Sequence, residues 1–274
     1  MKKINRRSFL AAAGLTAAAL ALTACGGSAS STASSTASSA ASSTSAAAEL
    51  TTVEAGKLTM ATNATFPPYE MTTDSGEIEG IDVDTAKAIA EKLGLELQID
   101  DMEFDAALLS VQQGKADIVM AGVTVTDERK AVMDFSDSYA TGIQSIIVPN
   151  DSDIASPDDL AGKKIGTQRG TTSYIYCSDD FGEDSVVAYD SGLTAVQALN
   201  NGQVDAVVID NAPATEYVAA NPGLKVLDTS YAEEDYAIGM AKGSALEDAV
   251  NKALEELKAD GTLQAIVDKY INAN

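Results

Sequence analysis

The chain of 274 residues contains no histidine. This absence removes His-containing catalytic triads, imidazole proton transfer and most zinc or iron sites. Only carboxylates, lysines and tyrosines remain for acid–base chemistry, and none of them stands out in the sequence. We therefore expect no catalytic residue, no metal and no cofactor.

Cysteine is almost as scarce, because Cys25 and Cys177 are the only two in the chain. If Cys25 is lipidated, as its surroundings indicate below, no disulfide can form within the chain. Cys177 is then expected to be a small, buried apolar side chain.

Basic residues are also few, with 18 Lys and Arg against 41 Asp and Glu and a formal net charge of −23. The four basic residues of the first 25 would leave with a signal peptide, which makes the balance −27. A body this acidic is a poor partner for nucleic acid or for an anionic lipid surface.

The first 25 residues have the features of an export signal. Four basic residues precede an apolar stretch at 9–24, which is too short for a confident membrane span. The stretch ends in "LTAC" (22–25), which resembles the bacterial lipobox, so we predict lipidation at Cys25. A plain signal peptide with a chance cysteine is the alternative. "NRRSFL" (5–10) also resembles the twin-arginine export consensus.

A segment of low complexity follows, since residues 28–48 are almost wholly Ser, Ala and Thr. Such a composition cannot bury a core, and we expect 26–54 to be a flexible tether. About 30 residues of this kind would span on the order of 30 Å. The predicted location is the outer face of the cell membrane, with the lipid as anchor, as in a Gram-positive lipoprotein.

Strand and helix signals alternate from residue 57 onward, which indicates an α/β architecture. Strands are expected at 57–62, 95–100, 116–122, 163–167, 185–189 and 204–210. Helices are expected at 82–94, 104–114, 244–258 and 261–271, and two more are expected, one that begins after Thr171 and one that ends at Leu199. The helices show apolar residues at helical spacing and often stop at glycine.

Two segments of the chain share one pattern, "QQGKADIVMAG" (112–122) and "NNGQVDAVVID" (200–210), at a constant offset of 88. Chance could produce this, but duplicated lobes are the favoured interpretation. Gly122 and Asp210 then occupy matching places at the carboxyl ends of two strands, where open α/β sheets bind ligands.

Several motifs occur in an order that resembles the bacterial extracellular solute-binding proteins of family 3, the amino-acid receptors of ABC importers. They are "TNATFPPYE", "GIDVDTAKAIAEKLG", "GVTVTDERKAVMDFSDSY", "GTQRGTTS" and "VDAVVIDNAP", and the resemblance covers residues 57–274. It implies a two-lobed, periplasmic-binding-protein-like fold of type II that closes around its ligand. The implied partners are a free amino acid and a membrane permease with its ATPase, and a monomer is expected.

The resemblance also implies the division of the body. Lobe 1 is predicted at 56–143 plus 239–274 and lobe 2 at 146–235. The two hinge crossings are expected near 141–148 and 235–240, where Gly239 would allow a change of backbone direction.

Arg129 is the strongest candidate for binding a carboxylate. Thr126 is placed to cap the helix that carries Arg129, and the preceding strand ends at Gly122, where no side chain blocks the backbone. A carboxylate there would meet the guanidinium, the Thr124 hydroxyl and a backbone donor. The alternative is a surface ion pair between Arg129 and a nearby acid such as Asp134.

Asp210 is the candidate for the opposite charge. In the resembling proteins this aspartate binds the ligand's α-ammonium group. The two lobes would then bind the two opposite charges of a zwitterion. Thr171 and Thr172 begin a helix of lobe 2 and either add to carboxylate binding or simply cap the helix. The resemblance also brings Ala121 into the ligand-binding set.

Phe66 and Phe104 fall where the family places aromatics around the ligand's side chain, although isolated aromatics are more often core residues. Asn63 stands where relatives that favour basic ligands commonly have an acid, and Gln168 matches a position that often contacts the side chain. An amide does not neutralise a cation. A polar, uncharged ligand such as glutamine, or cystine, is therefore preferred.

Two alternatives stay open. Basic amino acids are less favoured, although Glu103 or Glu70 could supply a charge. A dehydratase of cyclic acids on the same scaffold is the competing class, because a fold alone does not decide function.

Overall fold

A computed structural model of the protein describes residues 50–271. The predicted signal peptide at 1–25, the predicted lipidation site Cys25 and the tether as far as residue 49 lie outside the described residues. Within them, no helix combines the length and the apolar character that crossing a bilayer requires.

The described end of the predicted tether is attached to the folded body. Leu50 packs against the core, and the Val53 N–H donates to Asp117 Oδ1 at 2.8 Å. Asp117 also accepts from the Thr59 N–H through its other oxygen. One carboxylate therefore fixes the chain just before the first strand.

Lobe 1 is built on a five-stranded sheet with the order β5-β1-β6-β14-β7. Its strands are β1 (Lys57–Thr62), β5 (Glu96–Asp101), β6 (Ile118–Val119), β7 (Met133–Phe135) and β14 (Gly239–Ala241). β1 is parallel to β5 and β6, whereas β14 is antiparallel to β6 and β7. β6 is shorter than the strand predicted at 116–122, because the chain leaves the sheet and turns at Gly122, where φ is +55°.

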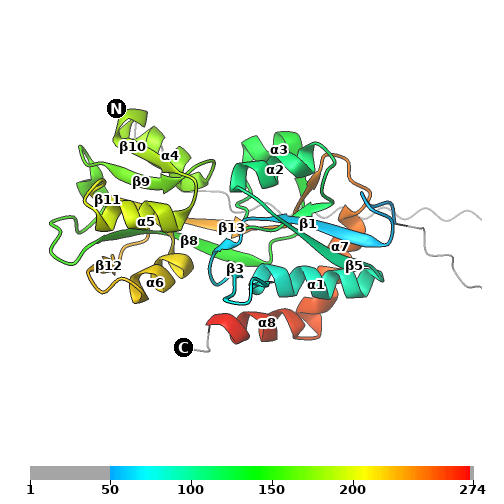
Figure 1. The fold of residues 1–274 in the computed structure, drawn as a ribbon. Coiled ribbons are helices and arrows are strands. Elements are labelled where there is room, and N and C mark those ends of the chain that lie inside the picture. The colour runs from blue at the N-terminus through cyan, green and yellow to red at the C-terminus, as the bar shows by residue number, and fades with distance from the viewer. Residues whose placement is uncertain (1–49, 272–274) are drawn as a thin grey trace, which may run out of the picture. The chain divides into compact units, whose positions relative to one another are not determined.

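Helices cover both faces of this sheet (Figure 1). They are α1 (Ile81–Leu93), α2 (Phe104–Gln112), α3 (Asp127–Val132), α7 (Glu247–Ala259) and α8 (Thr262–Ile271). One core lies under α1, α7 and α8, and a second lies under α2. A small antiparallel sheet of β2 (Thr65–Phe66), β3 (Glu70–Thr72) and β4 (Ile78–Glu79) joins β1 to α1.

Lobe 2 is built on a second sheet with the order β10-β9-β11-β8-β12, and β13 also pairs with β8. Its strands are β8 (Ala140–Pro149), β9 (Ile165–Gln168), β10 (Val186–Tyr189), β11 (Ala206–Asp210), β12 (Leu224–Val226) and β13 (Ala232–Tyr236). The helices are α4 (Thr172–Phe181), α5 (Gly192–Asn200) and α6 (Asn211–Ala219), with 3-10 turns η1 (Pro157–Leu160) and η2 (Glu183–Ser185).

The chain crosses between the two sheets twice, from β7 to β8 and from β13 back to β14. β8 and β13 run antiparallel, with Gly142 opposite Glu234 and Ala140 opposite Tyr236. The Tyr236 ring lies over Gly142, since a Cβ added at Gly142 would come within 2.4 Å of the ring carbon Cζ. The close contact of a glycine and a buried tyrosine thus packs the two crossing strands together.

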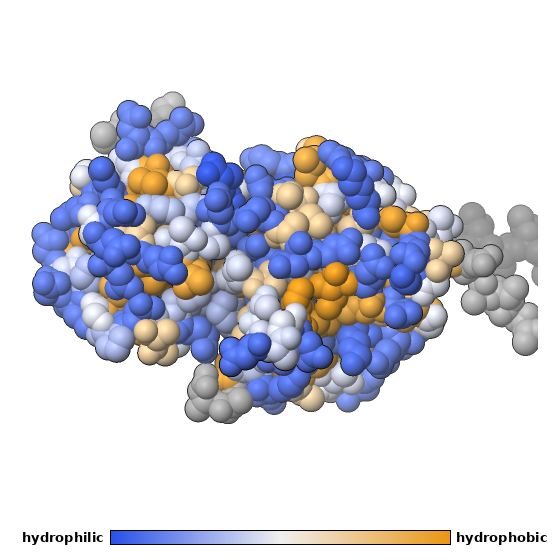
Figure 2. Space-filling model, viewed as in Figure 1, coloured by the Kyte–Doolittle hydropathy of each residue, from blue (hydrophilic) through white to orange (hydrophobic). Residues whose placement is uncertain are grey.

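The face of the molecule shown in Figure 2 is mostly hydrophilic, as the acidic composition predicts. Large hydrophobic side chains that remain exposed are scattered over several elements, at Val53, Leu109, Val132, Ile143, Ile175, Leu193 and Ile271. Scattered exposed residues of this kind are normal for a soluble surface.

The packing at the crossing strands gives a direct prediction. Gly142→Ala is expected to destabilise the protein by about 1–3 kcal/mol, because the methyl group overlaps the buried Tyr236 ring. Gly223→Ala is the matched control, since a Cβ there meets no atom within 4 Å, and its stability should stay near that of the wild type. Urea unfolding monitored by circular dichroism measures both. Equal stability of the two variants would contradict this account of the crossing.

Candidate functional site

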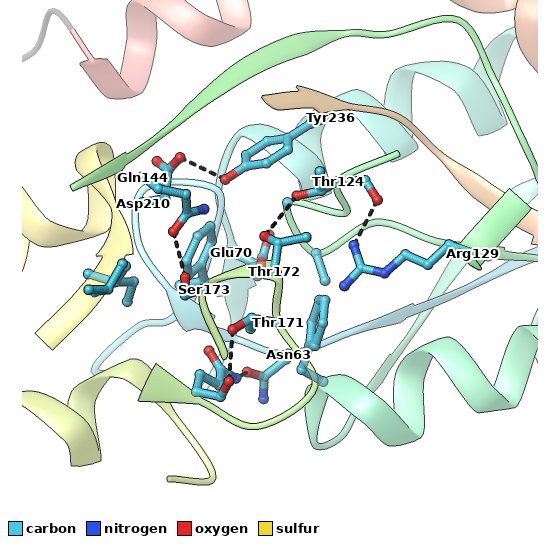
Figure 3. A pocket seen from close by; sticks show the side chains of 17 residues that line it. Asn63, Glu70, Thr124, Arg129, Gln144, Thr171, Thr172, Ser173, Asp210 and Tyr236 are labelled. Carbon is cyan, nitrogen blue, oxygen red and sulfur yellow. Dashed lines mark hydrogen bonds between the residues drawn. The ribbon is translucent and has the colours of Figure 1, made fainter. Parts of the chain in front are cut away.

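A small cavity lies between the two lobes, and residues from both lobes and from the crossing strands line it. It includes all eleven residues selected from the sequence, Asn63, Phe66, Phe104, Ala121, Gly122, Thr124, Arg129, Gln168, Thr171, Thr172 and Asp210. Six further residues complete the lining, Glu70, Gln144, Ser173, Val208, Ile209 and Tyr236. Figure 3 shows Arg129 and Asp210 on opposite sides of this cavity.

Arg129 is buried, with 9% of its surface exposed. The Thr126 hydroxyl accepts from the Arg129 N–H at 3.2 Å and begins α3, as the sequence predicts. The guanidinium donates from Nη1 to the Thr124 carbonyl at 2.7 Å and from Nη2 to the Gly170 carbonyl of lobe 2 at 3.2 Å. It also lies over the Phe104 ring, 5.5 Å from the centroid. These contacts fix the direction of the guanidinium and leave three of its five N–H groups for a ligand.

The alternative of a surface ion pair is wrong for Arg129. No carboxylate in the described part of the chain lies within ion-pair distance of it, and Asp134 instead pairs with Lys242 at 2.6 Å. Burial lowers the pKa of Arg129, against the opposing effect of the Glu234 carboxylate. A buried cation without a paired anion is costly, so this arrangement favours an anion that arrives from outside.

The N-terminus of α4 faces the same end of the cavity. The Thr171 hydroxyl caps the helix by accepting from the Tyr174 N–H at 3.4 Å and donates to the Gln168 carbonyl at 2.8 Å. Thr172 and Ser173 form the first turn, line the cavity and are buried. The first N–H groups of a helix have no carbonyl partner within it and attract anions. Together with Arg129, this turn can hold a carboxylate.

Asp210 ends β11 and caps α6. Its Oδ1 accepts from the Ala212 N–H at 3.1 Å, and its Oδ2 accepts from the Ile143 N–H and the Tyr236 hydroxyl, each at 2.8 Å. Burial raises the pKa of Asp210 to about 6, while these hydrogen bonds oppose the rise. Asp210 is therefore mostly ionised at neutral pH and can bind an ammonium group.

Phe66 and Phe104 both line the cavity. Phe66 stacks on Tyr69 with 5.7 Å between ring centroids. A Cβ at Gly122 would come within 2.8 Å of Phe66 Cε1. Position 122 thus requires glycine for two reasons, because its φ is positive and because the Phe66 ring comes too close for a side chain.

An amide pair that lines the cavity joins the two lobes. Gln168 Nε2 donates to Asn63 Oδ1 at 2.9 Å and to the Asp190 carbonyl at 3.3 Å. Asn63 Nδ2 donates to the Met102 carbonyl at 2.9 Å, and Asn63 Oδ1 also accepts from the Thr65 hydroxyl. Gln168 thereby uses both protons of its amide nitrogen, whereas Asn63 uses one of its two, so the pair offers the Gln168 Oε1 acceptor and one Asn63 N–H donor.

Glu70 is an acidic residue of the cavity lining. The sequence indicated it only as a possible source of charge for a basic ligand. Its side chain is fully buried, and neither carboxyl oxygen forms a hydrogen bond that meets ordinary geometry within residues 50–271. Burial, and after it the charge of Asp82, raises the pKa of Glu70 well above its usual value. Asp82 accepts from the Gly122 N–H at 3.0 Å, and burial raises its pKa to about 6. Two neighbouring acids therefore lie here, Glu70 at the wall of the cavity and Asp82 behind it.

Gln144 and Tyr236 were missed for a structural reason. They lie on the crossing strands β8 and β13, where alternation predicts burial but not the direction of the cavity. Glu103 lies outside the lining, as the N-cap residue of α2. In the part of the chain that the structure describes, no cluster of acidic or cysteine side chains is placed to hold a metal ion.

Comparison with known proteins gives consistent matches. The family model of bacterial extracellular solute-binding proteins, family 3, matches residues 58–273. The L-cystine-binding protein TcyJ of Escherichia coli (strain K12) is 33% identical over 225 residues, which cover 81% of this chain and 85% of that protein.

Solved structures extend the comparison to the fold. An ancestral arginine-binding protein bound to arginine is 44% identical with a TM-score of 0.75, over 79% of this chain and 98% of that one. A structure of an ancestral arginine-binding protein bound to glutamine gives 43% and 0.74 over the same shares of the two chains. The two-lobed α/β fold predicted from the sequence is confirmed by these neighbours.

The buried acids predict an unusual dependence of stability on pH. Asp82 and Asp210 have folded-state pKa values of about 6 against an ordinary value of 3.8, so the folded protein binds these protons more tightly than the unfolded chain. The free energy of unfolding of the ligand-free protein should therefore rise as the pH falls from 7.5 to 5.5, by about 1 kcal/mol for each group. Asp210→Asn should remove the contribution of Asp210, which is about half of this rise. Thermal melts across this window measure the effect, and a melting temperature that falls steadily on acidification would contradict it.

Proposed function

The chain belongs to the bacterial extracellular solute-binding proteins of family 3, and we propose that it captures a free amino acid and delivers it to an ABC permease driven by an ATPase. Its relatives include binding proteins for cystine, arginine and glutamine. They are substrate-binding transport proteins, so the chain is not an enzyme and the dehydratase alternative is set aside.

One observation carries the proposal, the position of Arg129 and Asp210 at opposite sides of a single cavity. An amino acid presents a carboxylate and an ammonium group on one carbon. The carboxylate would meet the Arg129 guanidinium and the first turn of α4, and the ammonium group would meet Asp210. Charge-assisted hydrogen bonds of this kind are about twice as strong as neutral ones.

Closure follows from the same geometry. Arg129 belongs to lobe 1, and Asp210 with the first turn of α4 belongs to lobe 2. A ligand that binds both sets of groups stabilises the closed arrangement, because only that arrangement makes both sets of contacts. The same lobes then open to release the ligand to the permease.

The family is extracellular or periplasmic, and we propose that Cys25 anchors this member to the outer face of the membrane through lipid. The proposed form is a monomer that acts with the permease and the ATPase as membrane partners. The acidic surface supports an independent body held near the membrane rather than one lying on anionic lipid.

A polar, uncharged side chain is the first proposal for the ligand. Asn63, an amide rather than an acid, lies in the cavity, and Gln168 Oε1 has no hydrogen-bond donor within residues 50–271. The side-chain amide of glutamine could donate to this oxygen while its aliphatic part packs between Phe66 and Phe104. Cystine is the second member of this class.

A basic amino acid is the second candidate, and Glu70 is the observation that favours it. Glu70 lies fully buried at the wall of the cavity beside Asp82, and within residues 50–271 no N–H or O–H group of ordinary geometry donates to it. Such a carboxyl suits a guanidinium or an ammonium group. Because its pKa is raised, Glu70 must release a proton when it pairs with such a cation. Binding of arginine would therefore strengthen as the pH rises.

The proposed function is tested first by a thermal-shift screen against the common amino acids and cystine. A ligand at 100 times its Kd should stabilise the protein by about 2.7 kcal/mol.

Arg129→Ala should reduce the affinity of the best ligand at least about 100-fold, because the variant loses two charge-assisted hydrogen bonds to the ligand carboxylate. Arg169→Ala is the control, because Arg169 is exposed and pairs only loosely with Asp190, and it should bind like the wild type. Unchanged affinity in Arg129→Ala would remove Arg129 from the binding role.

Glu70→Gln separates the two ligand classes. If arginine is the ligand, the variant should lose about tenfold or more in arginine affinity, because it lacks the charge, and the rise of affinity with pH should disappear. If glutamine is the ligand, its affinity should change by less than about threefold. Isothermal titration calorimetry at pH 6 and pH 8 measures both, with the exposed Glu77→Gln as control. Equal losses for arginine and glutamine would show that Glu70 acts only on the fold.

A further inference from the structure

Glu234 is a buried acid on the return crossing strand β13. Its two neighbours, Glu233 and Asp235, are exposed, whereas Glu234 points inward with 6% of its surface exposed. This alternation is ordinary for a strand, but the inward position is usually apolar. An acid that occupies it needs compensating partners.

Three side chains donate to a single oxygen of Glu234. Its Oε2 accepts from the Thr124 hydroxyl at 2.9 Å, from Gln144 Nε2 at 2.9 Å and from the Thr172 hydroxyl at 3.0 Å. Thr124 follows β6 in lobe 1, Thr172 starts α4 in lobe 2, and Gln144 lies on the outgoing crossing strand β8. The hydroxyl oxygens of the two threonines are 3.5 Å apart. Glu234 Oε2 thus accepts hydrogen bonds from both lobes and from the other crossing strand, β8.

The position of Glu234 is behind the cavity rather than in it. Its three donors, Thr124, Gln144 and Thr172, line the cavity (Figure 3). Glu234 is not among the lining residues. Its second oxygen, Oε1, is buried and accepts no hydrogen bond from the described residues. The negative charge of Glu234 acts on the nearby Arg129, whose own charge is also buried. Glu234 therefore offsets part of the cost of burying the Arg129 cation without forming an ion pair with it and without occupying the space of a ligand.

These contacts determine how the threonines face the cavity. A hydroxyl has one proton, and both threonines donate it to Glu234. Each hydroxyl then presents only lone pairs on its other side. The sequence-based expectation that the Thr124 hydroxyl donates to a ligand carboxylate does not fit this arrangement, which leaves that task to Arg129 and to backbone N–H groups.

We propose that Glu234 is a positioning residue that holds the two lobes together from the crossing strand and orients the hydroxyls of Thr124 and Thr172. Moving the lobes apart must lengthen at least one of the two threonine hydrogen bonds, because both end on the same atom. Glu234 thereby stabilises the closed arrangement before any ligand is bound. This inference goes beyond the proposed function, since its effect is measurable in the protein alone.

The experiment is hydrogen–deuterium exchange of the full, ligand-free chain, read by mass spectrometry. In Glu234→Ala, segments 122–126 and 170–175 should exchange about tenfold faster than in the wild type, because the lobes open more often. Glu234→Gln keeps one carbonyl acceptor and should give a smaller increase. Glu233→Gln, the exposed neighbour, should exchange like the wild type. Strand β1, in the core of lobe 1, should be unchanged in all variants.

The β1 control separates positioning from folding. Equal acceleration in β1 and in the cleft segments would mean that Glu234 only supports the fold, and no acceleration in the cleft would mean that it does not hold the lobes. Either result overturns the proposal. Calorimetry with L-glutamine and L-arginine adds a second reading, in which Glu234→Ala should weaken whichever of the two binds. If neither binds, the exchange result still decides the role of Glu234.

Discussion

The buried guanidinium of Arg129 is the interaction on which the site depends. Its partners within the described residues are two backbone carbonyls and an aromatic ring, and no carboxylate comes within ion-pair distance. Burying a cation in this way is unfavourable unless an anion completes it. The first turn of α4, which comes from the other lobe, supplies further donors for the same anion. The site therefore becomes electrostatically complete only when a carboxylate enters and the lobes are closed.

Closure is supported by contacts other than those to a ligand. The Arg129 guanidinium reaches the Gly170 carbonyl, Gln168 reaches Asn63, and the Tyr217 hydroxyl donates to the Thr65 carbonyl. Each of these bonds joins lobe 1 to lobe 2, and each breaks when the lobes separate. Because such bonds are exchanged for bonds to water on opening, the two neutral bonds contribute only about 0.5–1.5 kcal/mol each, and the bond of the charged Arg129 contributes about 1.5–3 kcal/mol. The balance between open and closed forms is thus small enough for a ligand to shift.

The sequence predicts much of this arrangement because its signals are local. Thr126 as the cap of α3 and Asp210 at the end of β11 could be located from their neighbours alone, and the order of motifs then brings them to one cavity. Glu70 and Glu234 could not be assigned in this way. Whether a strand residue turns toward a cavity or a core depends on how two crossing strands twist and pack, which is a tertiary property. The length of β6 was overestimated for the same reason, since the apolar run continues past the point where Gly122 turns the chain.

The distribution of charge around the cavity limits what it can hold. Asp210 and Glu70 line it with Arg129, while Asp82 and Glu234 lie behind it. Acids thus outnumber the single cation. Burial, more than repulsion between the acids, raises the pKa values of Glu70, Asp82 and Asp210, which expresses the cost of keeping these carboxylates ionised away from water. A ligand with a net negative charge would add to this cost, which disfavours aspartate and glutamate on physical grounds. A zwitterion relieves the charge at Asp210, and a second cationic group would relieve it at Glu70 as well. The choice between a neutral and a basic ligand therefore comes down to whether Glu70 holds its proton in the bound state.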